Sequence, residues 1–110
     1  MTGFVSFGNK RNYEDFKRNV PEIIQPLFDK LRMFCNTLGS KVIEDVRMHR
    51  VVFCKSMTFR WFADLEPTQI SILIKIQKDR KIPIEKIEIF PNQDMEEIQN
   101  ILKEAYACIH

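Results

Sequence analysis

The sequence has 110 residues, of which 45% are hydrophobic and 29% charged, and its formal net charge is +2. This length fits one domain that folds without a metal ion or a disulfide, and so small a charge does not by itself indicate a nucleic-acid-binding protein. Three cysteines without a Cys-x-x-Cys pair, no signal peptide and no apolar run of ~20 residues predict a soluble cytoplasmic protein without a membrane partner.

The chain begins with a polar segment and continues into a helical pattern. We expect residues 1–20 to form an N-terminal arm or short helical cap, and residues 21–110 to form a single α+β domain. Pro21 suits the first turn of a helix. From Leu27 onward apolar residues recur at three- and four-residue spacing, which predicts an amphipathic helix. Gly39 is expected to end this helix in the left-handed conformation.

Alternation of apolar and polar residues then predicts four β-strands. Their approximate ranges are 46–55, 58–65, 70–77 and 86–90. The side chains expected to face the core from the second and third strands are Phe59, Trp61, Ala63, Leu65, Ile70, Ile72, Ile74 and Ile76. Arg60, Phe62 and Asp64 are expected on the opposite face. Short connections favour an antiparallel meander.

A second amphipathic helix is predicted at the end of the sequence, with Asp94 as its N-cap and Glu97 three residues later. Two amphipathic helices can cover one apolar face of the sheet. The predicted fold is therefore a two-layer α+β sandwich, in which an N-terminal and a C-terminal helix pack on one face of a four-stranded antiparallel sheet (α-β-β-β-β-α).

The sequence contains no catalytic or metal-binding constellation. His49 and Cys54 are five residues apart within a predicted strand, so regular pleating places them on opposite faces, whereas structural zinc takes four converging ligands. Asp64 and Lys75 lie on adjacent predicted strands, but the Glu-x-Lys element of a nuclease-like site is missing there. The sequence favours a protein that is not an enzyme, with no catalytic residue, metal ion or cofactor.

The uncovered face of the predicted sheet is the candidate binding surface, because it combines cations with aromatic rings. Its expected members are Arg47, His49, Phe53, Lys55, Arg60, Phe62 and Lys75. This composition suits a protein–protein interface or a surface that stacks bases and neutralises phosphates. It also suits a solvated face whose long side chains cover apolar atoms.

Several segments occur in an order that resembles a small domain family of unknown function. They are residues 27–32 (LFDKLR), Leu38-Gly39, residues 51–55 (VVFCK), Phe59, residues 70–74 (ISILI) and Glu104-Ala105-Tyr106. Members of that family often occur at the C-terminus of proteins labelled predicted transport proteins, or beside nuclease-like and restriction-associated domains. The resemblance covers roughly residues 20–108 and implies a compact α+β module with an accessory role, and it supplies no catalytic residues.

The expected function is therefore non-catalytic binding, with self-association through the open sheet face or a strand edge. The expected partner is a second copy or another protein. One alternative is a nucleic-acid-binding accessory protein that uses the basic and aromatic face. A second alternative is a small-molecule-binding or enzymatic domain with a pocket between the first helix and the sheet, and a fully packed helix–sheet interface would argue against it.

Overall fold

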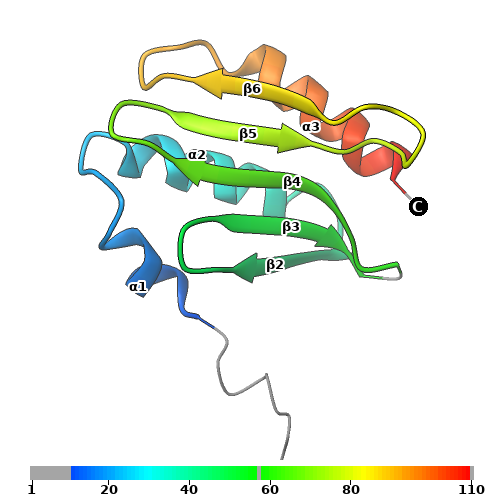
Figure 1. The fold of residues 1–110 in the computed structure, drawn as a ribbon, viewed down its shortest axis with the longest axis horizontal. Helices are drawn as coiled ribbons and strands as arrows, with labels where there is room; N and C mark the ends of the chain where they lie inside the picture. Colours follow the sequence, from blue (N-terminus) through cyan, green and yellow to red (C-terminus); the bar gives the residue numbers. More distant parts are fainter. Residues whose placement is uncertain (1–10, 57, 110) are drawn as a thin grey trace, which may run out of the picture.

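The computed structural model describes residues 11–56 and 58–109, so most of the predicted N-terminal arm lies outside the described residues. The elements in chain order are α1 (Tyr13–Lys17), α2 (Gln25–Asn36), β2 (Val42–Val46), β3 (Val51–Lys55), β4 (Arg60–Pro67), β5 (Ile72–Ile76), β6 (Glu85–Ile89) and α3 (Glu96–Cys108). The strands form one antiparallel sheet in the order β2-β3-β4-β5-β6, and α2 and α3 lie behind the same face of it (Figure 1). Among the described residues, no helix has the length and apolar character needed to cross a bilayer.

The fold is the expected α+β meander, but in the part of the chain that the structure describes the sheet has five strands and not four. The segment predicted as one strand over residues 46–55 reverses direction within residues 47–50, where the Arg47 N–H donates to the Arg50 carbonyl (2.8 Å). Residues 42–46, most of which were expected to precede the first strand, form β2. Neither face of residues 46–55 alternates cleanly because Met48 and His49 are exposed turn residues.

The segment predicted as an N-terminal arm or cap contains α1, whose buried side chains Tyr13 and Phe16 belong to the main core. Asn12 caps α1 by accepting a hydrogen bond from the Glu14 N–H (2.7 Å). The Tyr13 and Phe16 rings both pack on Phe28 of α2, at centroid distances of 6.2 and 5.2 Å.

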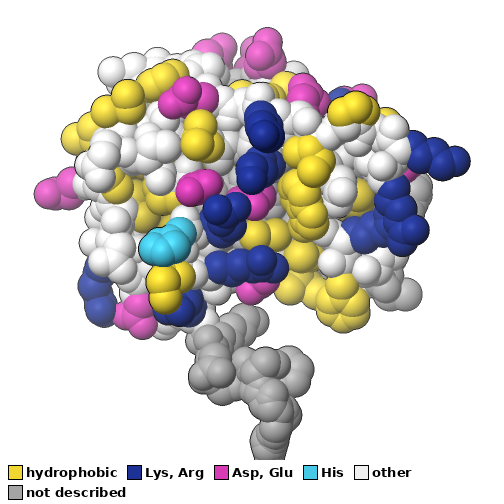
Figure 2. All heavy atoms as spheres, viewed as in Figure 1, with side chains coloured by type: hydrophobic (Ala, Val, Ile, Leu, Met, Phe, Trp, Pro, Cys, Tyr) yellow, Lys and Arg dark blue, Asp and Glu magenta, His cyan; other side chains and the backbone are white. Residues whose placement is uncertain are grey.

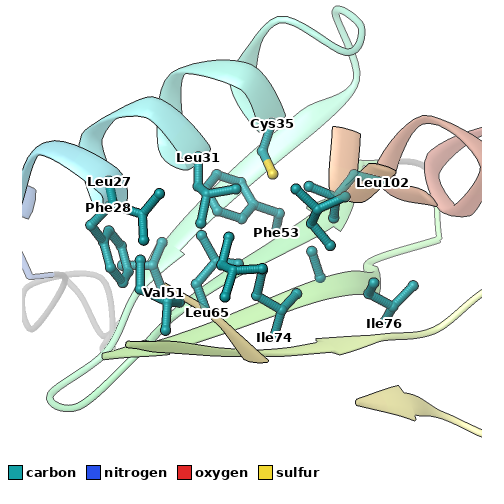
Figure 3. Packing of buried hydrophobic residues seen from close by; sticks show 14 of the residues in the cluster. Leu27, Phe28, Leu31, Cys35, Val51, Phe53, Leu65, Ile74, Ile76 and Leu102 are labelled. Carbon is teal, nitrogen blue, oxygen red and sulfur yellow. The ribbon is translucent and has the colours of Figure 1, made fainter. Parts of the chain in front are cut away.

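The interface between the helices and the sheet is filled by side chains. Figure 3 shows Leu27, Phe28, Leu31 and Cys35 of α2 directed at the inner face of the sheet, with Leu102 of α3 beside them. The inner face supplies Val51, Phe53, Leu65, Ile72, Ile74, Ile76 and Ile89. Ile72, Ile74 and Ile76 point inward as predicted, whereas Ile70 lies exposed in the turn before β5. The packing between α2 and the sheet does not favour the second alternative, a pocket between the predicted first helix and the sheet.

A one-residue bulge in β4 determines which side chains reach the core. Phe53 lies opposite Ala63, but the next residue, Cys54, lies opposite Trp61, so Phe62 is the extra residue. Phe62 and Ala63 are consequently both buried, and Trp61 turns to the other face, where it is half-buried. The expectation that Trp61 faces the core and Phe62 the solvent is therefore wrong.

Aromatic packing of Phe62 and hydrogen bonds from Gln77 stabilise the bulge. The Phe62 ring meets Phe53 at 6.5 Å and Tyr106 edge-on at 5.4 Å between centroids. The Gln77 side chain donates to the Trp61 carbonyl (2.8 Å), and the Gln77 N–H donates to the Phe62 carbonyl (3.0 Å). Phe59, expected in the core, is 75% exposed at the loop before β4 and has a left-handed φ of 55°.

Gly39 has a different role from the one expected. α2 ends at Asn36 with Thr37 as its C-cap, and Gly39 has no positive φ. A Cβ atom at Gly39 would lie 2.3 Å from the hydroxyl oxygen of Tyr106 and 2.8 Å from the adjacent ring carbon. Glycine is needed here because the Tyr106 ring packs directly on the backbone.

At the start of α3, the Asp94 carboxylate accepts from the Glu96 N–H (3.0 Å), although Met95 is the N-cap.

The bulge predicts opposite effects for two neighbouring aromatic residues. Phe62→Ala empties a fully buried site and is expected to lower the free energy of unfolding by about 3–5 kcal/mol. Trp61→Ala truncates a half-buried side chain on the other face and is expected to cost about 1–2 kcal/mol. Urea denaturation followed by circular dichroism measures both, and a larger loss for Trp61→Ala would contradict the assigned faces.

The close approach of Tyr106 predicts that Gly39→Ala destabilises the fold by about 1–3 kcal/mol through overpacking. Ser40→Ala is the matched control, because Ser40 is exposed and its truncation should change stability by less than about 0.5 kcal/mol. Tyr106→Phe removes the nearest atom and should recover part of the loss in the double variant. Equal stabilities for Gly39→Ala and the wild type in thermal denaturation would refute this role.

Candidate binding surface

The face of the sheet that points away from α2 and α3 is the candidate site, and we call it the open face. Its residues follow from the strand register: Ile43, Asp45, Arg50, Val52, Cys54, Trp61, Asp64, Glu66, Leu73, Lys75, Lys86 and Glu88. Figure 2 looks onto this face and shows a band of basic side chains with acidic ones beside it and hydrophobic side chains along one flank.

One row of the open face runs from an acidic to a basic edge of the sheet. The register places Asp45, Val52, Asp64, Lys75 and Lys86 next to one another across β2 to β6. Lys75 and Lys86 are thus directly opposite on adjacent strands, an arrangement that is unfavourable for like charges. Within the described residues, neither of these two lysines forms an ion pair.

Arg50 joins two carboxylates of β4. Its guanidinium donates to Asp64 Oδ2 at 3.1 Å and to Glu66 Oε1 at 3.3 Å. The Asp64 side chain is only 13% exposed, and its Oδ1 atom is buried without a hydrogen-bond donor among the described residues. An unsatisfied buried acceptor costs about 1–3 kcal/mol, so a donor from water or a bound partner would stabilise this part of the face.

A hollow of about 390 Å³ lies beside this ion pair, over β4, β5 and β6. Its polar lining combines three carboxylates with two ammonium groups: Asp64, Glu66, Glu88, Lys75 and Lys86. The Glu88 carboxylate already accepts from the Ser71 hydroxyl. The described part of the chain brings together no group of three or more His, Cys, Asp or Glu side chains that could hold a metal ion. The lining therefore suits groups that carry both signs of charge.

The neighbouring row of the open face is apolar. Ile43 lies opposite Cys54, and Cys54 lies opposite Trp61. Burial raises the pKa of the Cys54 thiol, with a smaller contribution from Asp45, so the thiol stays protonated at neutral pH. A protonated thiol is a weak nucleophile, and this row is suited to contact and not to covalent chemistry.

The structure does not bring the seven predicted binding residues together. Phe53 and Phe62 are fully buried and cannot stack on a ligand. Lys55 donates to the carbonyls of Tyr106 (2.9 Å) and Ile109 (3.2 Å), where its charge complements the C-terminal end of α3.

The other four predicted residues are more accessible. Arg47 lies in the turn after β2 and pairs with Asp45 (3.0 Å) at the rim of the open face. His49 is exposed in the same turn, and Arg60 begins β4 opposite Lys55. Lys75 alone of the seven lies within the open face itself. The turn at residues 47–50 and the bulge at Phe62 account for this dispersal, because each interrupts the regular alternation from which the open face is predicted.

Sequence reasoning missed a polar network in the helix layer. Tyr13 and Lys17 of α1 both donate to Asp29 of α2 at 2.7 Å. Arg32 of α2 donates to both carboxylate oxygens of Glu44 on β2, the longer bond being 3.0 Å, and lies 3.9 Å from the Tyr13 ring centroid. The hydrogen-bond partners are 12 to 16 residues apart and lie on different elements, so no local sequence pattern predicts these pairs.

The pKa shifts in this network have structural causes. Burial, followed by the hydrogen bond to Asp29, raises the pKa of Tyr13. Burial alone would raise the pKa of Asp29, but the hydrogen bonds from Lys17 and Tyr13 outweigh it and lower that pKa. Because Asp29 is matched by donors and Glu44 by Arg32, the network ties α1 to α2 and α2 to the sheet, and no free acid or base remains at its centre.

Comparisons of the chain with protein-family models, with curated proteins and with solved structures each found no match. The function of the open face is therefore inferred from its geometry.

The raised pKa of Tyr13 predicts how Tyr13→Phe changes stability with pH. At neutral pH the variant lacks the Asp29 hydrogen bond and is expected to be about 1–2 kcal/mol less stable. Above pH 10 the unfolded wild type ionises Tyr13 while the folded protein keeps the proton, so wild-type stability falls as pH rises. The gap between the two proteins should close above pH 10 in urea titrations, whereas a gap independent of pH would rule out this coupling.

Proposed function

We propose that the protein is a non-catalytic binding module that self-associates through its open face or through a strand edge beside it. The observation that supports this proposal is the one-sided architecture. Both long helices cover one face of the sheet, and no described element covers the other face (Figure 1). Three free thiols among the described residues are in keeping with a reducing cytosol, which we propose as its location.

The charge pattern of the open face argues against a nucleic-acid partner. Three cations on this face, Arg50, Lys75 and Lys86, are interspersed with four carboxylates. The carboxylates would repel phosphates, and the two phenylalanines expected to stack on bases lie in the core. A surface that carries both signs of charge instead fits a protein that presents the complementary pattern.

The same charges limit how a second copy can bind. A flat dimer that covered the whole face would remove seven charged side chains from water, and the desolvation cost of buried ion pairs often exceeds their mutual attraction. An association that leaves most of these charges hydrated is therefore favoured. Pairing through an edge strand of the sheet has this property, because it leaves the open face in contact with water. The packed interface behind the sheet supports neither an enclosed ligand pocket nor a catalytic cleft there.

Analytical ultracentrifugation over a wide range of protein concentration tests the proposal. The expected result is a shift from the monomer mass of 13.1 kDa to twice that value, with little dependence on salt. A parallel titration with labelled single-stranded DNA and RNA should show no binding that weakens steeply as salt rises. A strictly monomeric protein that binds nucleic acid in this salt-dependent way would overturn the proposal.

A further inference from the structure

We infer that strand β6 pairs antiparallel with β6 of a second copy, so that two sheets join edge to edge across a two-fold axis at Ile87. This inference rests on the proposed self-association and names the surface and register that carry it. A paired edge leaves the open face hydrated, in contrast to a face-to-face dimer.

The position of β6 makes this pairing available. It is the last strand in the order β2-β3-β4-β5-β6, and within residues 11–56 and 58–109 it pairs on one side only, with β5. Glu85, Lys86 and Glu88 are exposed along it. The outer backbone N–H and C=O groups of an edge strand can form hydrogen bonds with another strand. The inferred partner strand is β6 of a second copy.

The residues near Ile87 that share a face with Lys86 are complementary to themselves under a two-fold rotation. Antiparallel pairing centred on Ile87 sets Lys86 opposite Glu88 of the other copy, and Glu88 opposite Lys86. One residue further out, Glu85 lies opposite Ile89, and two residues further out Ile84 lies opposite Phe90. Ile84 and Phe90 are both exposed large hydrophobic residues (46% and 40%). Opposite charges and apolar pairs across strands each stabilise a sheet.

Two prolines delimit the same window. Pro83 and Pro91 lie four residues before and four residues after Ile87, so each would meet the other at the ends of the pairing. Proline has no N–H to donate to a neighbouring strand. The complementary segment is therefore confined to residues 84–90, which fixes the register and prevents the strands from sliding.

The pairing also relieves an unfavourable feature of the single chain. Lys86 lies opposite Lys75 and has no carboxylate partner among the described residues. Glu88 of the second copy would supply that carboxylate. The other edge strand, β2, has no such symmetry, because rotation about its central residue, Glu44, sets one carboxylate against another.

The geometry sets the scale of the expected affinity. An interface built on one strand pair is at the small end of specific contacts, below about 1,200 Å², which corresponds to transient association. Figure 1 shows that α3 begins beyond the outer edge of β6 and then passes behind this strand, so the two-fold axis would bring the first turns of the two α3 helices next to each other on the covered side of the joined sheet.

A charge-reversal experiment on the full chain tests the register. Lys86→Glu sets two pairs of carboxylates against each other in the dimer, and Glu88→Lys sets two pairs of ammonium groups against each other. Each single variant is expected to weaken dimerisation by about tenfold, measured by sedimentation equilibrium. The double variant Lys86→Glu/Glu88→Lys restores both pairs and should dimerise like the wild type, and an equal mixture of the two single variants should form a heterodimer tighter than either homodimer.

Lys30→Glu is the matched control, because it makes the same change in net charge as Lys86→Glu at an exposed position of α2, which contacts β2 at the far end of the sheet, and it should leave dimerisation unchanged. Circular dichroism establishes that each variant is folded. A wild-type dimer that persists in both single variants would overturn the β6 pairing and leave the proposed self-association intact. A wild-type protein that stays monomeric would overturn both.

Discussion

The extra residue in β4 is the constraint on which both faces of the sheet depend. By inserting Phe62 between the pairs Phe53–Ala63 and Cys54–Trp61, the bulge turns two consecutive side chains inward and one tryptophan outward. Phe62 then fills the space between Phe53 and Tyr106 under α3, and Trp61 completes the apolar row of the open face. Without this bulge the regular alternation would exchange these roles.

The sequence allowed the α+β class, both long helices and the inward-facing isoleucines of β5 to be predicted, because helical and strand periods extend over several residues there. It did not allow the strand count or the candidate site to be predicted. The turn at residues 47–50 and the bulge at Phe62 each change which side chains point to which face of the sheet. Neither can be recognised from the spacing of apolar residues in the sequence. The sequence also does not show that Lys55 binds the end of α3, because these contacts join residues more than 50 positions apart. Lys55 is therefore predicted on a binding surface, although its ammonium group is engaged within the fold.

The open face and the helix layer handle charge in opposite ways. In the helix layer, Asp29 and Glu44 are matched by donors on neighbouring elements, and the network fastens α1 and α2 to the sheet. On the open face, Lys75 and Lys86 face each other without a carboxylate partner among the described residues, and Asp64 keeps one buried oxygen unsatisfied. Charges that a fold leaves unmatched are available to a partner, which is why the proposed function is placed on this side of the sheet.

The place of α3 in the chain has a consequence for biosynthesis. The strands β2 to β6 all precede it, and its residues Ile98, Leu102 and Ala105 form part of the apolar layer that covers the inner face of the sheet. On the ribosome the strands are therefore made before the helix that shields part of them, and the inner face stays partly exposed until the last turn carrying Tyr106 can dock. The nascent chain would at that stage present an apolar surface of the kind that promotes aggregation and that chaperones shield.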